Sequence, residues 1–182
     1  LCDACAEEDR AGSDVSLALE ECNVPFTGVI HKFHEMSKPD QKMIAYYNGI
    51  LTPRHAYVEC RAEAERKCPA LRFPLIIKHP SGYSSVGLTK DCKVNNMEDL
   101  LLRLDAFLGE WKRALIEEFI AGEEATILAC ADSSMPDGVR CFTPVQIAFP
   151  EGEDFKHFDL KWLAFDDMEW TPVPTTHKSY KK

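Results

Sequence analysis

Lysine and serine side chains that could bind a phosphorylated ligand recur through the first two thirds of this sequence and once near its end. Lys38, Lys78 and Lys161 could neutralise the charge of a triphosphate. Directly after Lys78 comes the small-residue loop that contains Ser84 and Ser85, whose hydroxyls would lie beside backbone N–H groups. Such a loop suits an anion such as a phosphate. An ordinary hairpin with a polar turn and solvated lysines is the alternative interpretation of the same residues.

A second group of residues has the chemistry to hold a nucleoside. The segment from Glu117 to Ile120 ends an apolar run and could offer backbone N–H and C=O groups to the edge of an adenine ring. Phe119 and Ile120 could add apolar surface against that ring, and Glu124 could accept hydrogen bonds from ribose hydroxyls. Each residue alone could equally belong to an exposed strand end. The ordered set favours a nucleotide site.

Apolar periodicity and capping residues predict the elements that must position these side chains. The helices are expected at 13–22, from Ser37 (as cap) to Asn48-Gly49, at 59–67 and after the cap Asn96. The strands are expected at 75–78 and 88–90 on either side of the loop, and at 52–55, 114–120, 124–131 and 139–149. The helix after Asn96 has an apolar stripe that predicts core: Leu100, Leu101, Leu104, Phe107 and Leu108.

Composition excludes several classes of protein. The chain has 182 residues, is 45% hydrophobic and carries a formal net charge of −9, which argues against bulk binding to nucleic acid or to an anionic membrane. It has no apolar run long enough to span a bilayer. Eight cysteines without a secretory signal indicate reduced thiols in a cytosol-like compartment. The pair Cys2 and Cys5 forms a lone CxxC, read as incidental, since a zinc site needs a second pair.

The order of the chemistry-bearing segments resembles the ATP-grasp fold, and most closely the D-alanine–D-alanine ligase family. The resemblance covers nearly the whole chain from about Leu17. Its specific parts are Phe73–Lys78 with Ser84–Gly87, which resemble the family's phosphate-loop hairpin, and Leu115–Glu124, which resembles its adenine-binding hinge. Two weaker parts are Ser37–Lys42, similar to a family helix start, and Phe158–Trp162, similar to a lysine-containing stretch.

The resemblance implies an α+β ATP-grasp fold, truncated at both ends. Residues 1–36 would end an N-terminal substrate domain, 37–120 would form the central lid domain, and 121–182 would begin a C-terminal antiparallel-sheet domain. The sequence opens on Leu1, so we expect it to start inside a longer chain.

The resemblance also implies a role for each candidate residue. Lys38 and Lys78 would contact phosphates, and Lys161 would reach the terminal phosphate. Ser84 and Ser85 would lie under a mobile Gly-rich lid. The remaining residues would hold the nucleoside, bracketing adenine or binding ribose: Glu117, Phe119, Ile120 and Glu124.

The implied reaction is the ATP-dependent joining of a carboxylate to an amine through an acyl phosphate. ATP and Mg²⁺ would be required, with the metal ligands expected outside this segment. The partner would be a small amino acid or carboxylate, with no nucleic acid and no transmembrane segment. A homodimer or a larger assembly stays open, as does the choice between the cytoplasm and an organelle stroma-like reducing compartment.

Two departures from the family pattern support an alternative. Tyr83 occupies the position of a glycine before the paired serines. Trp162 occupies the position of a tyrosine, and its indole ring lacks the tyrosine hydroxyl. The alternative is a non-catalytic ATP-grasp-like scaffold subunit of a larger complex. A small redox protein that uses Cys2 and Cys5 is a third, weaker hypothesis.

Overall fold

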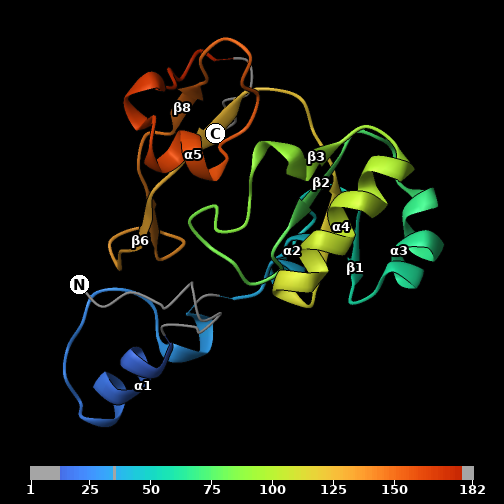
Figure 1. The fold of residues 1–182 in the computed structure, drawn as a ribbon. Helices are drawn as coiled ribbons and strands as arrows, with labels where there is room; N and C mark the ends of the chain where they lie inside the picture. Colours follow the sequence, from blue (N-terminus) through green and yellow to red (C-terminus); the bar gives the residue numbers. More distant parts are fainter. Residues whose placement is uncertain (1–12, 35, 178–182) are drawn as a thin grey trace. The chain divides into compact units, whose positions relative to one another are not determined.

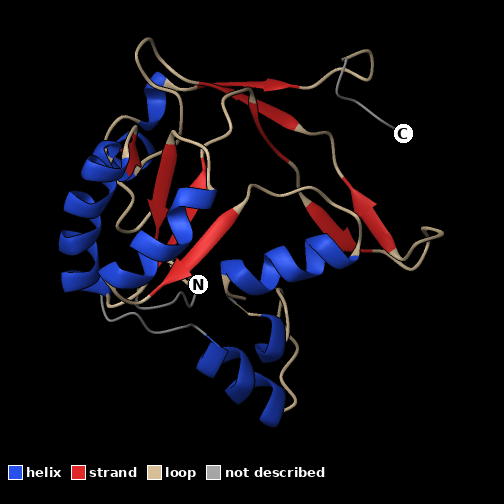
Figure 2. Ribbon diagram, turned by 90° about the vertical axis from the view of Figure 1, so that its right-hand side faces the viewer, coloured by secondary structure: helices blue, strands red, loops and turns tan. Residues whose placement is uncertain are grey.

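A computed structural model describes residues 13–34 and 36–177 and divides the chain into two compact units, Leu1–Ile120 and Ala121–Lys182. Both units combine helices with antiparallel strands (Figures 1 and 2). Among the described residues, none of the helices has the length and apolar character that a membrane crossing requires. The lone CxxC at Cys2 and Cys5 lies outside the described residues.

The first unit is built on a four-stranded antiparallel sheet in the order β1-β4-β2-β3. Its strands are β1 (His55–Val58), β2 (Leu75–Lys78), β3 (Lys93–Val94) and β4 (Ala114–Glu118). Its helices are α1 (Ser13–Glu21), α2 (Lys38–Tyr47), α3 (Arg61–Lys67) and α4 (Met97–Trp111). The observed ends of α1, α2 and α3 lie within two residues of the predicted ends, and for α4 only the start was predicted.

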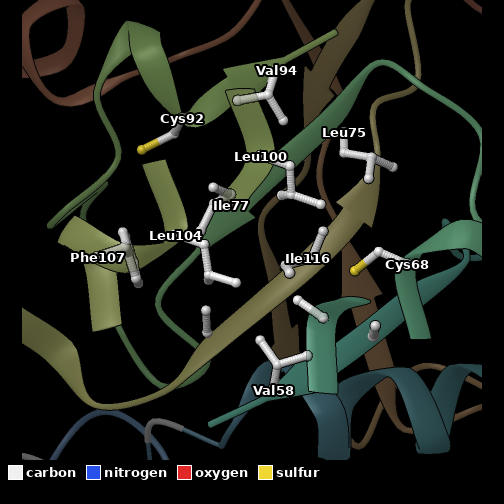
Figure 3. Close-up of a cluster of buried hydrophobic side chains, with 13 residues drawn as sticks. Val58, Cys68, Leu75, Ile77, Cys92, Val94, Leu100, Leu104, Phe107 and Ile116 are labelled. Carbon is white, nitrogen blue, oxygen red and sulfur yellow. The ribbon is translucent and has the colours of Figure 1, made fainter. Parts of the chain in front are cut away.

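Strand alternation decides which side chains of the sheet enter the core. In β4, Ala114 and Ile116 join the buried apolar cluster, in which they meet residues of α3 and α4. Figure 3 shows Leu75, Ile77 and Ile116 of the strands among Leu100, Leu104 and Phe107 of α4. The predicted stripe of α4 is confirmed as core, with Leu101 and Leu108 packed at its edge.

The helix ends follow from local hydrogen bonding. The Ser37 hydroxyl accepts from the Asp40 N–H at 3.2 Å, so Ser37 caps α2 as predicted. The Asn96 side chain accepts from the Asp99 N–H at 2.9 Å and caps α4 in the same way. Gly49, with φ of +70°, follows the end of α2, where the sequence predicts a left-handed stop.

The predicted strand at 88–90 is wrong. Ser84, Ser85 and Gly87 have φ of +54°, +62° and +68°, so the chain makes successive tight turns instead of returning directly beside β2. A short 3₁₀ helix, Lys90–Cys92, follows, and the return strand is β3, which pairs with Leu75 and Ile76. Non-glycine residues seldom adopt this left-handed conformation, so a Ser-Ser pair gives little signal for it.

The second unit contains two small antiparallel sheets and a short helix. One sheet has the order β5-β8-β9, and the other is the hairpin β6-β7. The elements are β5 (Glu124–Thr126), β6 (Ala129–Ala131), β7 (Val139–Cys141), β8 (Val145–Ala148), α5 (Phe158–Trp162) and β9 (Glu169–Pro172). Ile147, Leu160 and Met168 form a small core between the three-stranded sheet and α5.

The two long strands predicted for this unit are each split. Residues 124–131 form β5 and β6, and residues 139–149 contain β7 and β8, because β5 pairs with β8 while β6 pairs with β7. Pro144 stands at the break before β8, where it cannot donate a backbone hydrogen bond. Its carbonyl instead accepts from the Val173 N–H at 2.8 Å.

Six described cysteines are free thiols, and two of them, Cys68 and Cys92, are fully buried in the first unit. Burial raises the pKa of the Cys68 thiol to about 11, with a smaller opposing effect from Lys67. This thiol therefore acts as a small apolar core group.

Candidate nucleotide site

The face of the first unit's sheet opposite α3 and α4 carries the candidate phosphate-binding lysine of β2. In the β2–β4 register, Glu117 pairs with Ile76, which places it diagonal to Lys78 on the same face. Helix α2 supplies Lys38 and Lys42 to this site, four residues apart and therefore on one side of the helix. The site thus combines two strands and one helix end.

The Glu117 carboxylate lies between two ammonium groups. Its Oε1 is 2.7 Å from Lys42 Nζ, and its Oε2 is 2.8 Å from Lys78 Nζ. The Glu117 and Lys42 side chains are only 7% and 9% exposed, whereas Lys78 is 29% exposed. Burial raises the pKa of Glu117, but Lys78 and Lys42 more than offset that effect, so its pKa lies below the ordinary value and the carboxylate is charged.

Lys38 binds the loop that follows β2. Its Nζ donates to the carbonyl oxygen of His79 at 3.0 Å and also to that of Gly82, and its backbone N–H donates to the Pro80 carbonyl at 2.8 Å. Burial lowers the pKa of Lys38 to about 8, and the nearby charge of Lys78 adds to this, with Glu117 acting in the opposite direction. The Lys38 ammonium therefore interacts electrostatically with Lys78 and with the Glu117 carboxylate.

The loop itself packs tightly on α4. The Val86 N–H donates to the Tyr83 carbonyl and the Leu88 N–H to the Ser85 carbonyl, each at 3.0 Å. The His79 ring meets the Trp111 ring edge to face, with centroids 5.2 Å apart. A Cβ added at Gly87 would lie 3.0 Å from Trp111 Nε1, so a side chain at this position would press on the indole.

The hinge after β4 has two of its N–H groups already engaged. The Glu118 N–H donates to the Arg54 carbonyl at 2.9 Å, and the Phe119 N–H donates to the Pro74 carbonyl at 2.8 Å. An adenine edge would therefore have to be read by groups other than these two N–H donors. Lys93 Nζ lies 4.0 Å from the centre of the Phe119 ring. Ile120 is 63% exposed.

Glu118 points away from Glu117 and serves a different purpose. Its carboxylate accepts from the Arg72 backbone N–H at 3.0 Å and lies 2.9 Å from the Arg72 guanidinium. The hydrogen bonds from Arg72 lower the pKa of Glu118. The pair fixes the chain just before β2.

The second unit holds the remaining candidates in a cluster of its own. Lys156 Nζ is 3.6 Å from Glu124 Oε1 and 4.7 Å from the centre of the Trp170 ring. Lys161 Nζ lies 5.3 Å from the centre of the Trp162 ring. Burial lowers the pKa of Lys161, and the charge of Lys156 lowers it further. Each unit therefore presents its own group of site candidates.

These clusters contain two further lysines, for which the sequence predicted no role. Lys42 pairs with Glu117, and Lys156 pairs with Glu124. For Lys42 the available signal was its spacing of four residues from Lys38 on a helix. For Lys156 it was its place, five residues before Lys161, in an acidic segment.

The charges of the first unit's cluster fit a polyphosphate better than a metal. Three ammonium groups, Lys38, Lys42 and Lys78, accompany a single carboxylate, that of Glu117. Among residues 13–34 and 36–177, no group of three or more His, Cys, Asp or Glu side chains could hold a metal ion. The ligand-binding roles predicted for all nine candidate residues, from Lys38 to Lys161, stay predictions.

Comparisons with known proteins agree with this fold. No protein-family model matches the chain. A D-alanine–D-alanine ligase of Ectopseudomonas mendocina is 31% identical over 165 residues, which is 88% of this chain and 49% of that protein. A Bacillus anthracis D-alanine–D-alanine ligase, solved in complex with ATP, superposes with a TM-score of 0.65 at 22% identity, over 88% of this chain and 47% of that one.

A third similar protein acts on a different pair of substrates according to its name. The VanG D-Ala:D-Ser ligase of Enterococcus faecalis superposes with a TM-score of 0.64 at 20% identity, over 79% of this chain and 43% of that one. Sheet order, helices and these superpositions show that the chain has the ATP-grasp fold. In sequence it is similar to the D-alanine–D-alanine ligases over most of its own length. It spans about half the length of the curated relatives it matches.

Proposed function

We propose that this chain is the ATP-binding part of an ATP-dependent carboxylate–amine ligase. The observation that carries the proposal is the cluster of Lys38, Lys42 and Lys78 around Glu117, at the end of a strand that leads into a glycine- and serine-containing loop. An excess of buried positive charge needs an anionic partner, and a triphosphate supplies one. The family relationship supports ATP as that partner.

In the proposed reaction, the carboxylate substrate attacks the γ-phosphoryl group of ATP, ADP leaves, and an acyl phosphate forms. The amine then attacks the acyl carbon, loses a proton and displaces phosphate, which gives the amide. The residues of this chain would bind and orient the triphosphate and neutralise its charge. Mg²⁺ would supply further neutralisation of the triphosphate charge. The amino acid partners are not fixed by the fold, since similar folds occur in ligases with different named substrates.

The proposal predicts that Lys78→Ala weakens binding of Mg-ATP about tenfold or more, because a charge-assisted contact to phosphate is lost. The measurement is isothermal titration calorimetry on the protein that carries this chain, produced at its natural length. Lys90→Ala, which removes an exposed lysine just beyond the loop, is the matched control and should leave the dissociation constant unchanged.

Equal ATP affinity in wild type and Lys78→Ala would contradict this site. A second assay measures phosphate release in the presence of each of a panel of amino acids. If the protein binds ATP but releases no phosphate with any of them, the scaffold hypothesis is favoured instead. Release of phosphate that depends on one amino acid would identify both the activity and its substrate.

A further inference from the structure

We propose that Lys42 is a positioning residue of the nucleotide site: it neutralises Glu117 from the buried side, so that Glu117 can hold the Lys78 ammonium without cancelling its charge. The inference rests on the proposed function above. It concerns a residue that would not itself touch the nucleotide.

The geometry separates the roles of the two lysines. Both lie within hydrogen-bond distance of Glu117, but on different carboxylate oxygens. Lys42 is 9% exposed and also donates to the Pro53 carbonyl at 3.0 Å, so it is anchored in the protein. Lys78 is 29% exposed and is therefore the one of the two with surface to offer a ligand.

Charge balance explains why a second lysine is needed. A lone Glu117–Lys78 pair would be neutral as a whole and would attract a phosphate only weakly. With Lys42 present, the three groups carry one net positive charge, and the exposed member of the set is Lys78. Because the set is largely shielded from water, this difference of one charge is weakly screened.

The contact between Lys42 and Glu117 also fixes the carboxylate in space. Glu117 lies on β4, diagonal to Lys78 on β2, while Lys42 lies on α2. The carboxylate is thus held from two directions, by a helix and by a neighbouring strand. This arrangement limits the rotamers of Glu117 and, through it, those of Lys78.

The test compares Lys42→Met with the double variant Lys42→Met/Glu117→Gln. In the single variant, Glu117 neutralises Lys78, and the dissociation constant for ATP should rise about tenfold, as expected for losing one charge next to a phosphate. In the double variant, the amide oxygen that replaces the carboxylate can still accept from Lys78, and one net positive charge returns. Its dissociation constant should lie within about threefold of wild type.

Adenosine provides the control ligand, because it has no phosphate. Its affinity should be the same in wild type and in Lys42→Met, whereas a general loss of structure would weaken adenosine and ATP together. The double variant also changes a residue predicted to contact adenine, so its ATP affinity is compared with the adenosine affinity of the same protein. Thermal melting of each variant without ligand measures stability separately from affinity. A structural role alone would change the melting temperature but would not make the loss specific to the phosphorylated ligand.

The outcomes separate this inference from the proposed function. If wild type binds no ATP, the proposed function fails. If wild type binds ATP but Lys42→Met binds it equally well, or the double variant is as weak as the single one, only the role of Lys42 is overturned. If Lys42→Met does not fold, the double variant decides: near-wild-type affinity supports the inference, and a tenfold loss refutes it.

Discussion

Lys38 should titrate near pH 8, because burial and the neighbouring Lys78 lower its pKa from the ordinary 10.5. The unfolded chain keeps this proton up to about pH 10.5, so between these values the unfolded state binds more protons than the folded state. The free energy of unfolding must therefore rise with pH across this window. The cost of burying the charged amine is fully present below pH 8 and is relieved above it.

The magnitude follows from the two pKa values. Integrated from pH 7 to pH 10, the linkage contributes about 2–3 kcal/mol, given about 1.4 kcal/mol for each unit of pKa. Lys38→Met removes this titration along with the hydrogen bonds to the loop carbonyls. The free energy of unfolding of wild type should therefore gain about 2–3 kcal/mol relative to the variant over this range.

Urea denaturation at several pH values, followed by the fluorescence of Trp111 next to the loop, measures the difference. To follow that residue alone, Trp162 and Trp170 are replaced by Phe in every protein compared. Lys90→Met controls for the change in net charge. Parallel curves for wild type and Lys38→Met would refute the reasoning, as would an NMR titration of the Lys38 side chain with a midpoint near 10.5.

Two further substitutions test the packing of the first unit, each against a matched control. Gly87→Ala should destabilise by about 1–2 kcal/mol, because a side chain there combines a positive φ with pressure on Trp111. Gly49→Ala, in the same unit, shares the positive φ but meets nothing within 4 Å, so equal losses in urea unfolding would exclude a role for the indole contact. Leu104→Ala should cost about 2–5 kcal/mol in the same assay because it leaves a cavity in the core, whereas Leu102→Ala, at a side chain that is 75% exposed, should change little, and similar losses for both would contradict the core assignment.

Periodic and capped elements could be predicted from the sequence. The α4 stripe and the Ser37 and Asn96 caps depend on neighbours three or four residues away, so the local sequence contains the signal. The family resemblance and the ATP-grasp fold are also confirmed. The path from Ser84 to β3 depends instead on left-handed serines and on packing against Trp111, which no local pattern specifies.

The candidate site was accessible to sequence reasoning only in part. Lys78 and Glu117 were both predicted as site residues, for phosphate and for adenine, but their ion pair depends on the pairing of β2 with β4. Lys42 was missed because a lysine in an amphipathic helix is usually solvated, and its burial depends on how α2 meets the sheet. The same holds for Lys156, whose contacts with Glu124 and Trp170 join segments distant in sequence.

The adjacent glutamates of β4 place a constraint on how this strand can evolve. Glu117 neutralises lysines on one face, and Glu118 anchors Arg72 on the other. Inserting or deleting a single residue in β4 would exchange the two carboxylates between faces and separate each of them from its basic partners. Length variation among descendants of this gene should therefore concentrate outside the paired strands and outside the loop that Lys38 and Trp111 hold in place.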